Sequence, residues 1–247
     1  MNITDTKPAL SRRVFLLGAA SASASLGGCA ATAPTRTQLV APAAYRPIEE
    51  APDNGELEAR YASLMDDGHA IPAVPYQKMD PKYYRQRVTD PTGEAPGTVV
   101  VDTPSRFLYL VEAGGTAMRY GVGIGRMGFA WEGEGIIHWR QHWPRWKPPS
   151  EMIIRRPELE KYSVANGGMD PGVDNPLGAR ALYIFKNGED TLYRLHGSPE
   201  WHSIGKAMSS GCVRLVNQDV IDLYERVPYH ARIVVYQSPL RDQGLPA

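Results

Sequence analysis

The sequence contains almost no cysteine, with 2 residues, Cys29 and Cys212, in a chain of 247. Cys29 closes a stretch that is typical of an export signal, so the exported body would keep one thiol without a disulfide partner. Exported proteins use cysteine mostly in disulfides, and an unpaired thiol in an oxidising compartment is a liability unless it has a use. Cys212 is therefore the first candidate for a chemical role.

The sequence also lacks an excess of either charge, with 27 basic and 27 acidic residues. Proteins that bind nucleic acid usually carry a basic surface that meets the phosphates. We therefore expect no nucleic-acid partner. With 43% hydrophobic residues the chain can bury one sizeable core, and its length fits one domain with appended segments.

The N-terminal apolar stretch is shorter than the roughly 20 residues that a membrane-spanning helix requires. It covers 14–26, follows the adjacent pair Arg12 and Arg13, and is followed by Gly-Gly-Cys. A positively charged start before a short apolar stretch predicts an export signal over 1–28. The two arginines favour the twin-arginine type over the ordinary secretory type.

The end of this signal, Leu-Gly-Gly-Cys, resembles a bacterial lipobox, in which the cysteine is acylated and becomes the mature N-terminus. It predicts lipidation at Cys29, a location in the periplasm or cell envelope, and attachment to the inner or outer membrane. The alternative is a plain secreted protein cut after 31–33, although Pro34 disfavours cleavage there.

Changes in composition divide the rest of the chain. The segment 29–54 is rich in Ala, Pro and Thr, which is typical of a flexible tether. We expect 55–96 to be an N-terminal extension that wraps on the main domain, with a short helix over 56–67. The main domain is expected over 97–237 and a C-terminal tail over 238–247.

From Gly97 onward the pattern is that of short strands separated by turns. The first three strands form a predicted meander with a Gly114-Gly115 turn, and one helix is expected from an Asn217 cap to Val227. The expected strands are 98–102, 107–112, 118–124, 135–140, 181–185, 193–196 and 231–236. The fold class is therefore predicted to be mostly β, a sandwich or barrel with one or two short helices.

A long insert between strands, 139–175, is rich in loops and carries Trp143 and Trp146. Long loops in compact domains are often functional. Two interpretations stay open: a lid or substrate wall, and a surface cover that seals one face of the sheet with its tryptophans.

Cys212 is preceded by Ser209, Ser210 and Gly211, and it lies sixteen positions after His196. A free thiol has a pKa of about 8.5, so a nucleophilic cysteine at neutral pH needs a base such as histidine. Gly211 allows a tight turn in which backbone N–H groups can point at a carbonyl oxygen that gains negative charge. The alternative is an inert cysteine beside a satisfied histidine.

Patterns for metals and cofactors are weak. His138 and His142 are four residues apart, but no glutamate separates them and tryptophan does, so no metal site is expected. The glycine-rich 121–125 lacks the spacing and the following helix of a dinucleotide loop, so no cofactor is expected. Arg126, Arg180 and Arg194 are expected to be exposed, solubilising charges, with binding of an acidic ligand as the alternative.

The Leu-His-Gly run at His196, the segment 209–215 and the upstream 176–178 together resemble the L,D-transpeptidase catalytic domain of bacterial cell-wall enzymes, of the YkuD type. The resemblance covers 97–237, and the combination of His-Gly with Ser-x-Gly-Cys-x-Arg is highly specific. Many members carry histidine immediately before the motif glycine, where this sequence has Ser210.

The resemblance implies an enzyme that acts on peptidoglycan stem peptides. Cys212 would attack the carbonyl at the L-centre of meso-diaminopimelate in a donor tetrapeptide, expel the terminal D-alanine and hold the stem as a thioester. His196 would act as general base and then as general acid. The amine of a second stem, or of a protein attached to the wall, would then accept the stem. The family's thiol also accepts carbapenems, so the protein is expected to be a carbapenem target.

The same resemblance assigns the remaining residues. In this family a main-chain carbonyl or a small polar residue near the motif orients the histidine ring, so Ser210 is the expected orienter of His196. Backbone donors at Gly211 and Cys212 form the expected oxyanion site. Arg214 is expected to bind a substrate carboxylate, with a structural ion pair that holds the cysteine loop as the alternative. The expected substrate contacts are Arg214, Gly197 and Ser209.

Other activities remain as alternatives. An L,D-carboxypeptidase would resolve the same thioester with water, and the sequence does not distinguish acceptors. Papain-like endopeptidases place cysteine before histidine in the chain, and sortase-like transpeptidases carry a different run at the cysteine. A non-catalytic murein-binding lipoprotein of the same fold would be expected to lack Cys212 or His196, and both are present.

Overall fold

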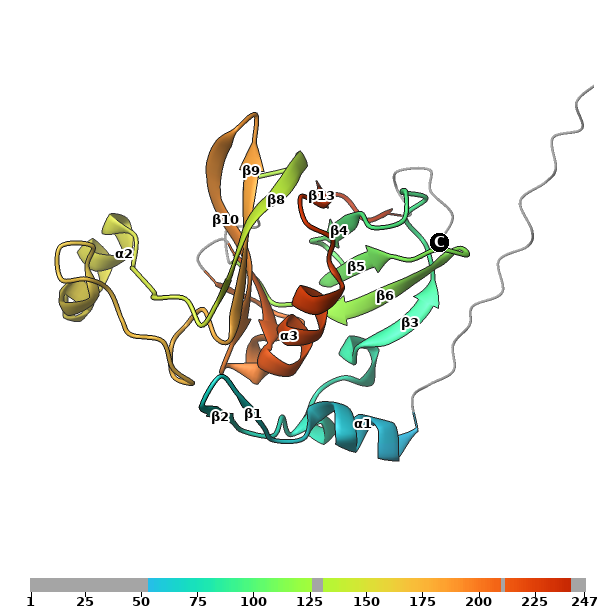
Figure 1. The fold of residues 1–247 in the computed structure, drawn as a ribbon, viewed down its shortest axis with the longest axis horizontal. Helices are drawn as coiled ribbons and strands as arrows, with labels where there is room; N and C mark the ends of the chain where they lie inside the picture. The colour runs from blue at the N-terminus through green and yellow to red at the C-terminus, as the bar shows by residue number, and fades with distance from the viewer. Residues whose placement is uncertain (1–52, 126–130, 210–211, 241–247) are drawn as a thin grey trace, which may run out of the picture. The chain divides into compact units, whose positions relative to one another are not determined.

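A nine-stranded mixed sheet organises the part of the chain that the computed structural model describes, residues 53–125, 131–209 and 212–240 (Figure 1). The strands are β3 (Gln86–Thr89), β4 (Val99–Asp102), β5 (Phe107–Val111), β6 (Thr116–Gly121), β8 (Gly133–His142), β9 (Arg180–Lys186), β10 (Glu189–Ser198), β12 (Val213–Val216) and β13 (Arg232–Tyr236). Their order is β12-β10-β9-β8-β13-β4-β5-β6-β3. The β10–β12 and β13–β4 pairs are parallel.

Short helices and two small strand pairs complete the described fold. The α-helices are α1 (Asn54–Tyr61), α2 (Ser150–Arg155) and α3 (Asn217–Arg226), and the 3-10 helices are η1 (Tyr76–Lys78), η2 (Pro81–Tyr83), η3 (Pro157–Tyr162) and η4 (Trp201–Ser203). The small pairs are β1 (Leu64–Asp66) with β2 (His69–Ile71), and β7 (Ile124–Gly125) with β11 (Ala207–Ser209). The predicted fold class, mostly β, is confirmed. The described part of the main domain contains two α-helices, α2 and α3, and α1 lies in the extension.

The main core lies where the sheet bends around α3 (Figure 1). Apolar side chains of β4, β5 and β6 meet those of β9, β10 and β12 there, together with Val220 and Leu223 of α3. Burial of this apolar surface is the main force that holds the layers together. Leu195 and Val213 point into this core. Because side chains alternate along a strand, their neighbours on β10 and β12 point to the opposite face.

The local elements of the main domain follow the sequence pattern closely. The predicted meander is present as β4, β5 and β6, with antiparallel pairing throughout. The helix expected from Asn217 begins and ends as predicted, but the Asn217 side chain does not cap it. Its Oδ1 accepts a hydrogen bond from the Ala179 N–H at 3.0 Å. The side chain therefore joins α3 to the segment before β9.

The helix predicted over 56–67 is shorter in the structure. It ends at Tyr61, and β1 and β2 form a hairpin around Asp67 and Gly68, whose φ angles are +47° and +84°. An Asp-Gly pair is a strong signal for a two-residue hairpin turn, because both positions need positive φ. The spacing of apolar residues predicted a longer helix, but the preference of Asp-Gly for a hairpin turn decides the structure of this segment.

The extension is fastened to the main sheet at several points. β3 pairs with β6 as the edge strand of the nine-stranded sheet. Asp66 accepts two hydrogen bonds from the Arg180 guanidinium, at 2.6 and 2.8 Å. The Arg180 side chain is only 3% exposed, so the expectation of a solubilising charge there is wrong. The domain boundary at 97 stays a prediction.

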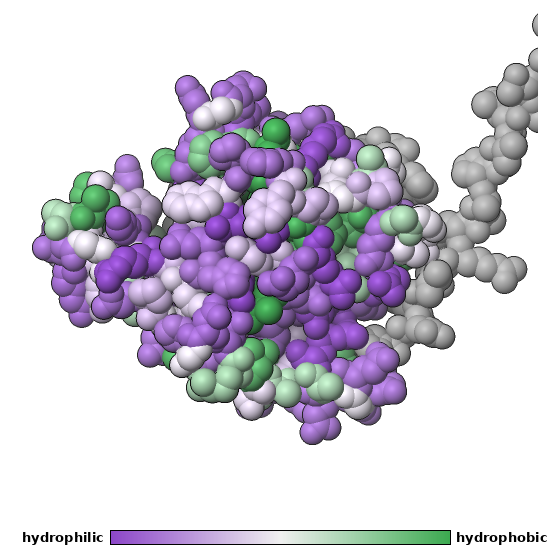
Figure 2. All heavy atoms as spheres, viewed as in Figure 1, coloured by the Kyte–Doolittle hydropathy of each residue, from purple (hydrophilic) through white to green (hydrophobic). Residues whose placement is uncertain are grey.

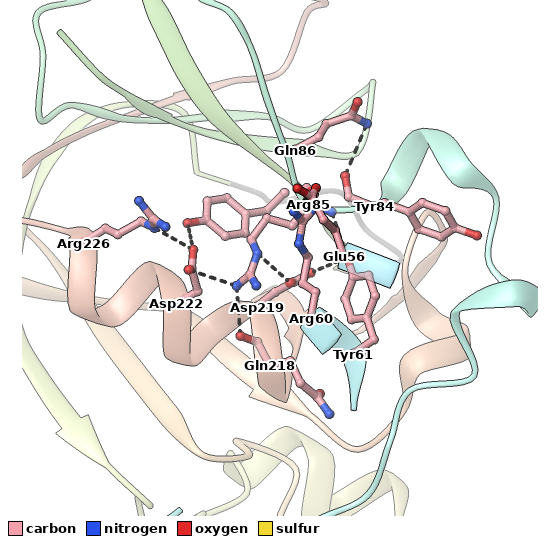
Figure 3. A network of polar contacts seen from close by, with 11 residues as sticks. Glu56, Arg60, Tyr61, Tyr84, Arg85, Gln86, Gln218, Asp219, Asp222 and Arg226 are labelled. Atoms are coloured by element: carbon pink, nitrogen blue, oxygen red, sulfur yellow. Dashed lines mark hydrogen bonds and ion pairs between the residues drawn. The ribbon is translucent and has the colours of Figure 1, made fainter. Parts of the chain in front are cut away.

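A buried polar network also joins the extension to α3 (Figure 3). Arg85 lies 3.2 Å from an oxygen of Asp222 and 3.6 Å from an oxygen of Asp219. Tyr120 donates its hydroxyl proton to Asp222 at 2.7 Å. The Tyr61 hydroxyl accepts a hydrogen bond from the Arg85 backbone N–H at 2.8 Å and lies 3.5 Å from Asp219. Charge pairing thus links segments more than a hundred residues apart.

The insert 139–175 has two parts. Trp143 is buried, packs with Ile71, and donates its indole N–H to Asp66 at 2.8 Å, as a cover would. The part around α2 instead exposes apolar side chains, Ile154 and Val164 among them, and Figure 2 shows apolar residues on this surface. Trp143 thus packs on the β1–β2 hairpin, and both interpretations of the insert stay predictions.

Several predictions concern residues outside the described ranges. The export signal 1–28, nearly all of the tether 29–54, Arg126 and the lipidation site Cys29 are among them, and they stay predictions. Of the tail 238–247, only the first three residues are described. Within residues 53–125, 131–209 and 212–240, no helix is long and apolar enough to cross a membrane.

Candidate active site

His196 lies on β10, and Cys212 lies immediately before the neighbouring strand β12. The parallel strands β10 and β12 pair Leu195 with Val213 and His196 with Arg214. Cys212 immediately precedes β12, two residues before Arg214, so alternation puts it on the same face of the sheet as His196. This face is opposite to the core around α3. Cys212 is half-buried, and His196 is 4% exposed.

A main-chain oxygen holds the His196 ring. Its Nδ1 lies 2.6 Å from the carbonyl oxygen of Gly197. A carbonyl oxygen only accepts hydrogen bonds, so Nδ1 must carry the proton and donate it. In the neutral ring the lone pair is then on Nε2. The Gly197 carbonyl therefore selects the tautomer that a general base requires.

The protonation state of His196 follows from its surroundings. Burial lowers the pKa of His196 to about 4, the bond to Gly197 opposes this shift, and the positive charges of Arg214 and Arg194 add to it. The imidazole is therefore neutral at pH 7 and able to accept a proton.

The Cys212 thiol is also neutral at rest. Burial raises the pKa of the thiol, while a hydrogen bond from the Arg194 backbone N–H and the charges of Arg194 and Arg214 oppose the rise. The site thus rests as a thiol beside a neutral imidazole. Such a pair reacts when the base removes the proton as the sulfur attacks, with no standing thiolate.

Packing against α3 explains the glycine after the histidine. A Cβ atom at Gly197 would lie 2.4 Å from Oδ1 of Asn217 and 2.9 Å from Val220. A Cβ at Gly178 would lie 2.2 Å from the same Asn217 oxygen. Neither distance is sterically possible without displacement of α3, so both positions favour glycine. The contact fixes the carbonyl that orients His196, and the role of Gly197 as a substrate contact stays a prediction.

Arg214 forms an ion pair in this structure. Its guanidinium lies 2.5 Å from Glu200, whose side chain is half exposed. Its backbone exchanges two hydrogen bonds of 2.9 Å with Gly123, which closes the outer side of β12. The ion-pair alternative thus describes Arg214 in the structure. A substrate carboxylate would have to replace Glu200 to reach Arg214.

The other predicted site residues lie at or beyond the limits of the description. Ser209 ends β11, which runs parallel to β7 and pairs there with Gly125. Ser210 and Gly211 lie outside the described residues, so their orienting and oxyanion roles stay predictions.

The described residues also bear on the metal patterns. His138 and His142 lie on β8, not on a helix. His142 Nδ1 is 2.8 Å from a carboxylate oxygen of Asp67, and the His138 ring packs on Phe185. Within the described ranges, no three His, Cys, Asp or Glu side chains gather in a way that would hold a metal ion.

The expectation that Arg194 is an exposed, solubilising charge is wrong. Its side chain is 14% exposed and forms two hydrogen bonds with Asp190, at 2.7 and 2.8 Å. Its backbone contacts the Cys212 sulfur. The signal was present in the sequence, because Arg194 is two residues before His196 on a strand and so shares its face.

Comparisons with known proteins agree with the motif. The family model of the L,D-transpeptidase catalytic domain matches residues 96–235. The chain is similar to the probable L,D-transpeptidase YbiS of Escherichia coli K12, with 30% identity over 155 residues, 59% of this chain and 46% of that protein. It is also similar to the probable L,D-transpeptidase ErfK/SrfK of Salmonella typhimurium, with 31% identity over 147 residues, 58% and 45% of the two chains. The chain spans about half the length of the curated relatives it matches.

A solved structure from Brucella melitensis is similar over 62% of this chain and 94% of that one, at 45% identity and a TM-score of 0.45. It is described as a probable carnitine operon oxidoreductase. That description concerns the other protein, and structural similarity at this level carries no conclusion about the activity of this chain.

Proposed function

The chain belongs to the L,D-transpeptidase catalytic domain family, and from this premise we propose that it is a peptidoglycan L,D-transpeptidase with Cys212 as nucleophile. The observation that carries the proposal is the shared sheet face of Cys212 and His196, with the His196 tautomer set by the Gly197 carbonyl. Family membership supplies the substrate class, the stem peptides of peptidoglycan.

The first half of the reaction forms a thioester. The Cys212 sulfur attacks the carbonyl carbon at the L-centre of meso-diaminopimelate while His196 Nε2 accepts the thiol proton. The tetrahedral intermediate then collapses, the C–N bond to D-alanine breaks, and His196 returns its proton to the leaving amine. The ring begins neutral and can accept the thiol proton, and because the pKa of His196 is lowered to about 4, its conjugate acid gives that proton up readily to the leaving amine.

The second half transfers the stem to an amine. The incoming amine attacks the thioester carbon, His196 accepts the amine proton, and the C–S bond breaks as the thiol is restored. The acceptor is a second stem peptide, which gives a 3–3 crosslink, or a protein that becomes attached to the wall. Backbone N–H groups at Gly211 and Cys212 are the proposed donors to the oxyanion in both halves.

We assign substrate recognition to Arg214 by exchange of partners. Its present partner Glu200 is 50% exposed, and an exposed ion pair contributes little to stability. A stem carboxylate that enters the site can therefore replace Glu200 at small cost and form a bidentate pair with Arg214. Ser209 and Gly197 are the further proposed contacts.

The test is turnover of a tetrapeptide muropeptide by the purified protein. We expect crosslinked dimers with the wild type and none with Cys212→Ala, which removes only the sulfur and keeps the unfolding temperature. Intact-mass analysis should show a carbapenem adduct on the wild type and not on Cys212→Ala. Tripeptide monomers without dimers would assign a carboxypeptidase instead. Turnover by Cys212→Ala would refute the mechanism.

We propose that the protein works in the periplasm or cell envelope, exported by a twin-arginine-type signal and anchored by a lipid on Cys29. The support is the Leu-Gly-Gly-Cys ending of the N-terminal apolar stretch. Labelled palmitate should enter the full chain and should be absent from Cys29→Ser. Equal labelling of both would refute the anchor and leave the chemistry at Cys212 untouched.

A further inference from the structure

Three residues on neighbouring strands, together with Cys212 just before β12, form a row on the sheet face that carries His196. Arg194 of β10 pairs with Tyr183 of β9, and Tyr183 pairs with Trp139 of β8. At the other end of the row, the Arg194 backbone N–H meets the Cys212 sulfur. A continuous series of contacts, through Arg194 and Tyr183, thus runs across the sheet from Cys212 to Trp139.

Contacts within the protein hold the side chains of the row in place. The Tyr183 ring lies between the Arg194 guanidinium, 4.4 Å from its centroid, and the Trp139 ring, 4.8 Å away at an interplanar angle of 23°. The Tyr183 hydroxyl donates to Gln141 at 3.1 Å, and Asp190 holds Arg194 from the side. A ligand that binds here therefore loses little free energy to the ordering of side chains.

Trp139 presents an aromatic surface to solvent. Its side chain is 55% exposed, although it stacks on Tyr183 at one side. An exposed aromatic ring beside polar groups is typical of ligand sites, where a flat apolar face packs on the ring. The C–H face of a pyranose sugar is such a surface. The row therefore has the chemistry of a sugar subsite.

The length of the row matches the length of a stem peptide. Neighbouring strands are about 4.8 Å apart, so the three steps from β12 to β8 put Trp139 about 14 Å from Cys212 along the row. The stem has three residues between the sugar and the attacked carbonyl, and three α-linked residues span about 11 Å when extended. The lactyl link between stem and sugar covers the remainder.

We propose that this row is a subsite for the N-acetylmuramic acid sugar that carries the donor stem, with the Trp139 indole as the stacking surface. The inference rests on the proposed function and extends it from the peptide to the glycan. It makes the protein selective for stems that are still attached to sugar over free peptides of the same sequence.

The test compares two donors in the full-length protein, a disaccharide tetrapeptide and the free tetrapeptide. We expect the wild type to show the larger kcat/KM for the sugar-bearing donor. Trp139→Ala should lower the ratio of the two kcat/KM values by roughly twofold to tenfold, the range that one aromatic stack supports. Trp139→Phe should retain most of the ratio.

Tyr229→Ala is the matched control, because Tyr229 is an aromatic residue of 77% exposure that packs on Arg140 on the α3 side of the sheet. It should leave the ratio unchanged. A ratio that Trp139→Ala does not change would overturn the subsite.

A binding experiment separates failure of the subsite from failure of the proposed function. Cys212→Ala is titrated with each donor, and the disaccharide tetrapeptide should bind more tightly than the free tetrapeptide. Equal affinities would overturn the subsite even if the wild type catalyses transfer. A preference for the sugar-bearing donor that Trp139→Ala removes would support the subsite even if transfer is absent.

Discussion

His196 and Asp219 are both almost fully buried ionisable side chains, 4% and 1% exposed, yet their surroundings differ in kind. His196 has a main-chain carbonyl as its partner, and the nearby charges of Arg194 and Arg214 repel a proton from it. Asp219 has Arg85 as its partner and Asp222 as a like-charged neighbour. Burial alone therefore does not decide how the two groups behave.

Burial shifts the pKa values of the two groups in opposite directions. Burial lowers the pKa of His196 to about 4, so the ring loses its proton and becomes the base that the proposed reaction needs. Burial raises the pKa of Asp219 to about 7, against the opposing charge of Arg85. In the candidate site, burial itself gives His196 the protonation state that the proposed reaction needs. In the network of Arg85, Asp219 and Asp222, the positive charge of Arg85 opposes the effect of burial on the pKa of Asp219.

The largest expected effect comes from removal of that arginine. Arg85→Met leaves Asp219 buried without its cation, and loss of one partner of a buried pair typically costs about 3–5 kcal/mol of unfolding free energy. Urea unfolding at pH 7 measures the loss. The second substitution Asp219→Asn in the same chain should recover part of it, because the uncompensated charge is then absent.

Arg156→Met is the matched control, because Arg156 pairs with Glu158 and both side chains are 62% exposed. Exposed pairs contribute little, so the unfolding free energy should stay as in the wild type. If Arg85→Met is no more damaging than this control, the extension does not depend on charge pairing.

Features of the fold that depend on local sequence patterns could be predicted from the sequence. The strands of the meander and the bounds of α3 follow local patterns, so the sequence predicted them. The sequence also predicted Cys212 and His196 as a pair from one motif, and the structure puts the two residues on one face of the sheet. The Asp67-Gly68 hairpin has a signal of two residues, but the prediction of a helix over 56–67 missed it. Such features need no knowledge of which distant segments meet.

The polar partners were not accessible. Arg85 and Asp219 are 134 positions apart, and Asp66 and Arg180 are 114 apart. Nothing in the local pattern around Arg180 indicates that a carboxylate will meet it. The row from Cys212 to Trp139 depends on the register of four strands, including the bulge in β8 between Ile137 and Trp139. A shift of one residue would put Trp139 on the other face.

A smaller expected effect is the opposite pH dependence that His196 and Asp219 give to the unfolding free energy. A histidine in an unfolded chain has a pKa of about 6.5, whereas His196 in the folded protein has a pKa of about 4. Between these values the unfolded state binds more protons, so His196 lowers stability as the pH falls through this window, by at most roughly 3 kcal/mol. Asp219 acts in the opposite sense, because its raised pKa makes the folded state bind more protons than the unfolded state between about pH 4 and 7.

His196→Gln isolates the histidine contribution, since a glutamine amide can still donate to the Gly197 carbonyl but does not titrate. Urea unfolding of wild type and variant from pH 7 to pH 4 gives the difference between them, in which contributions from Asp219 and all other shared groups cancel. We expect this difference to move in favour of the variant as the pH falls from 6.5 toward 4. A histidine that burial keeps neutral must make this difference in unfolding free energy depend on pH. If the difference stays constant from pH 6.5 to 4, the folded protein does not resist protonation of His196. The description of the site as a thiol and a neutral imidazole would then be wrong.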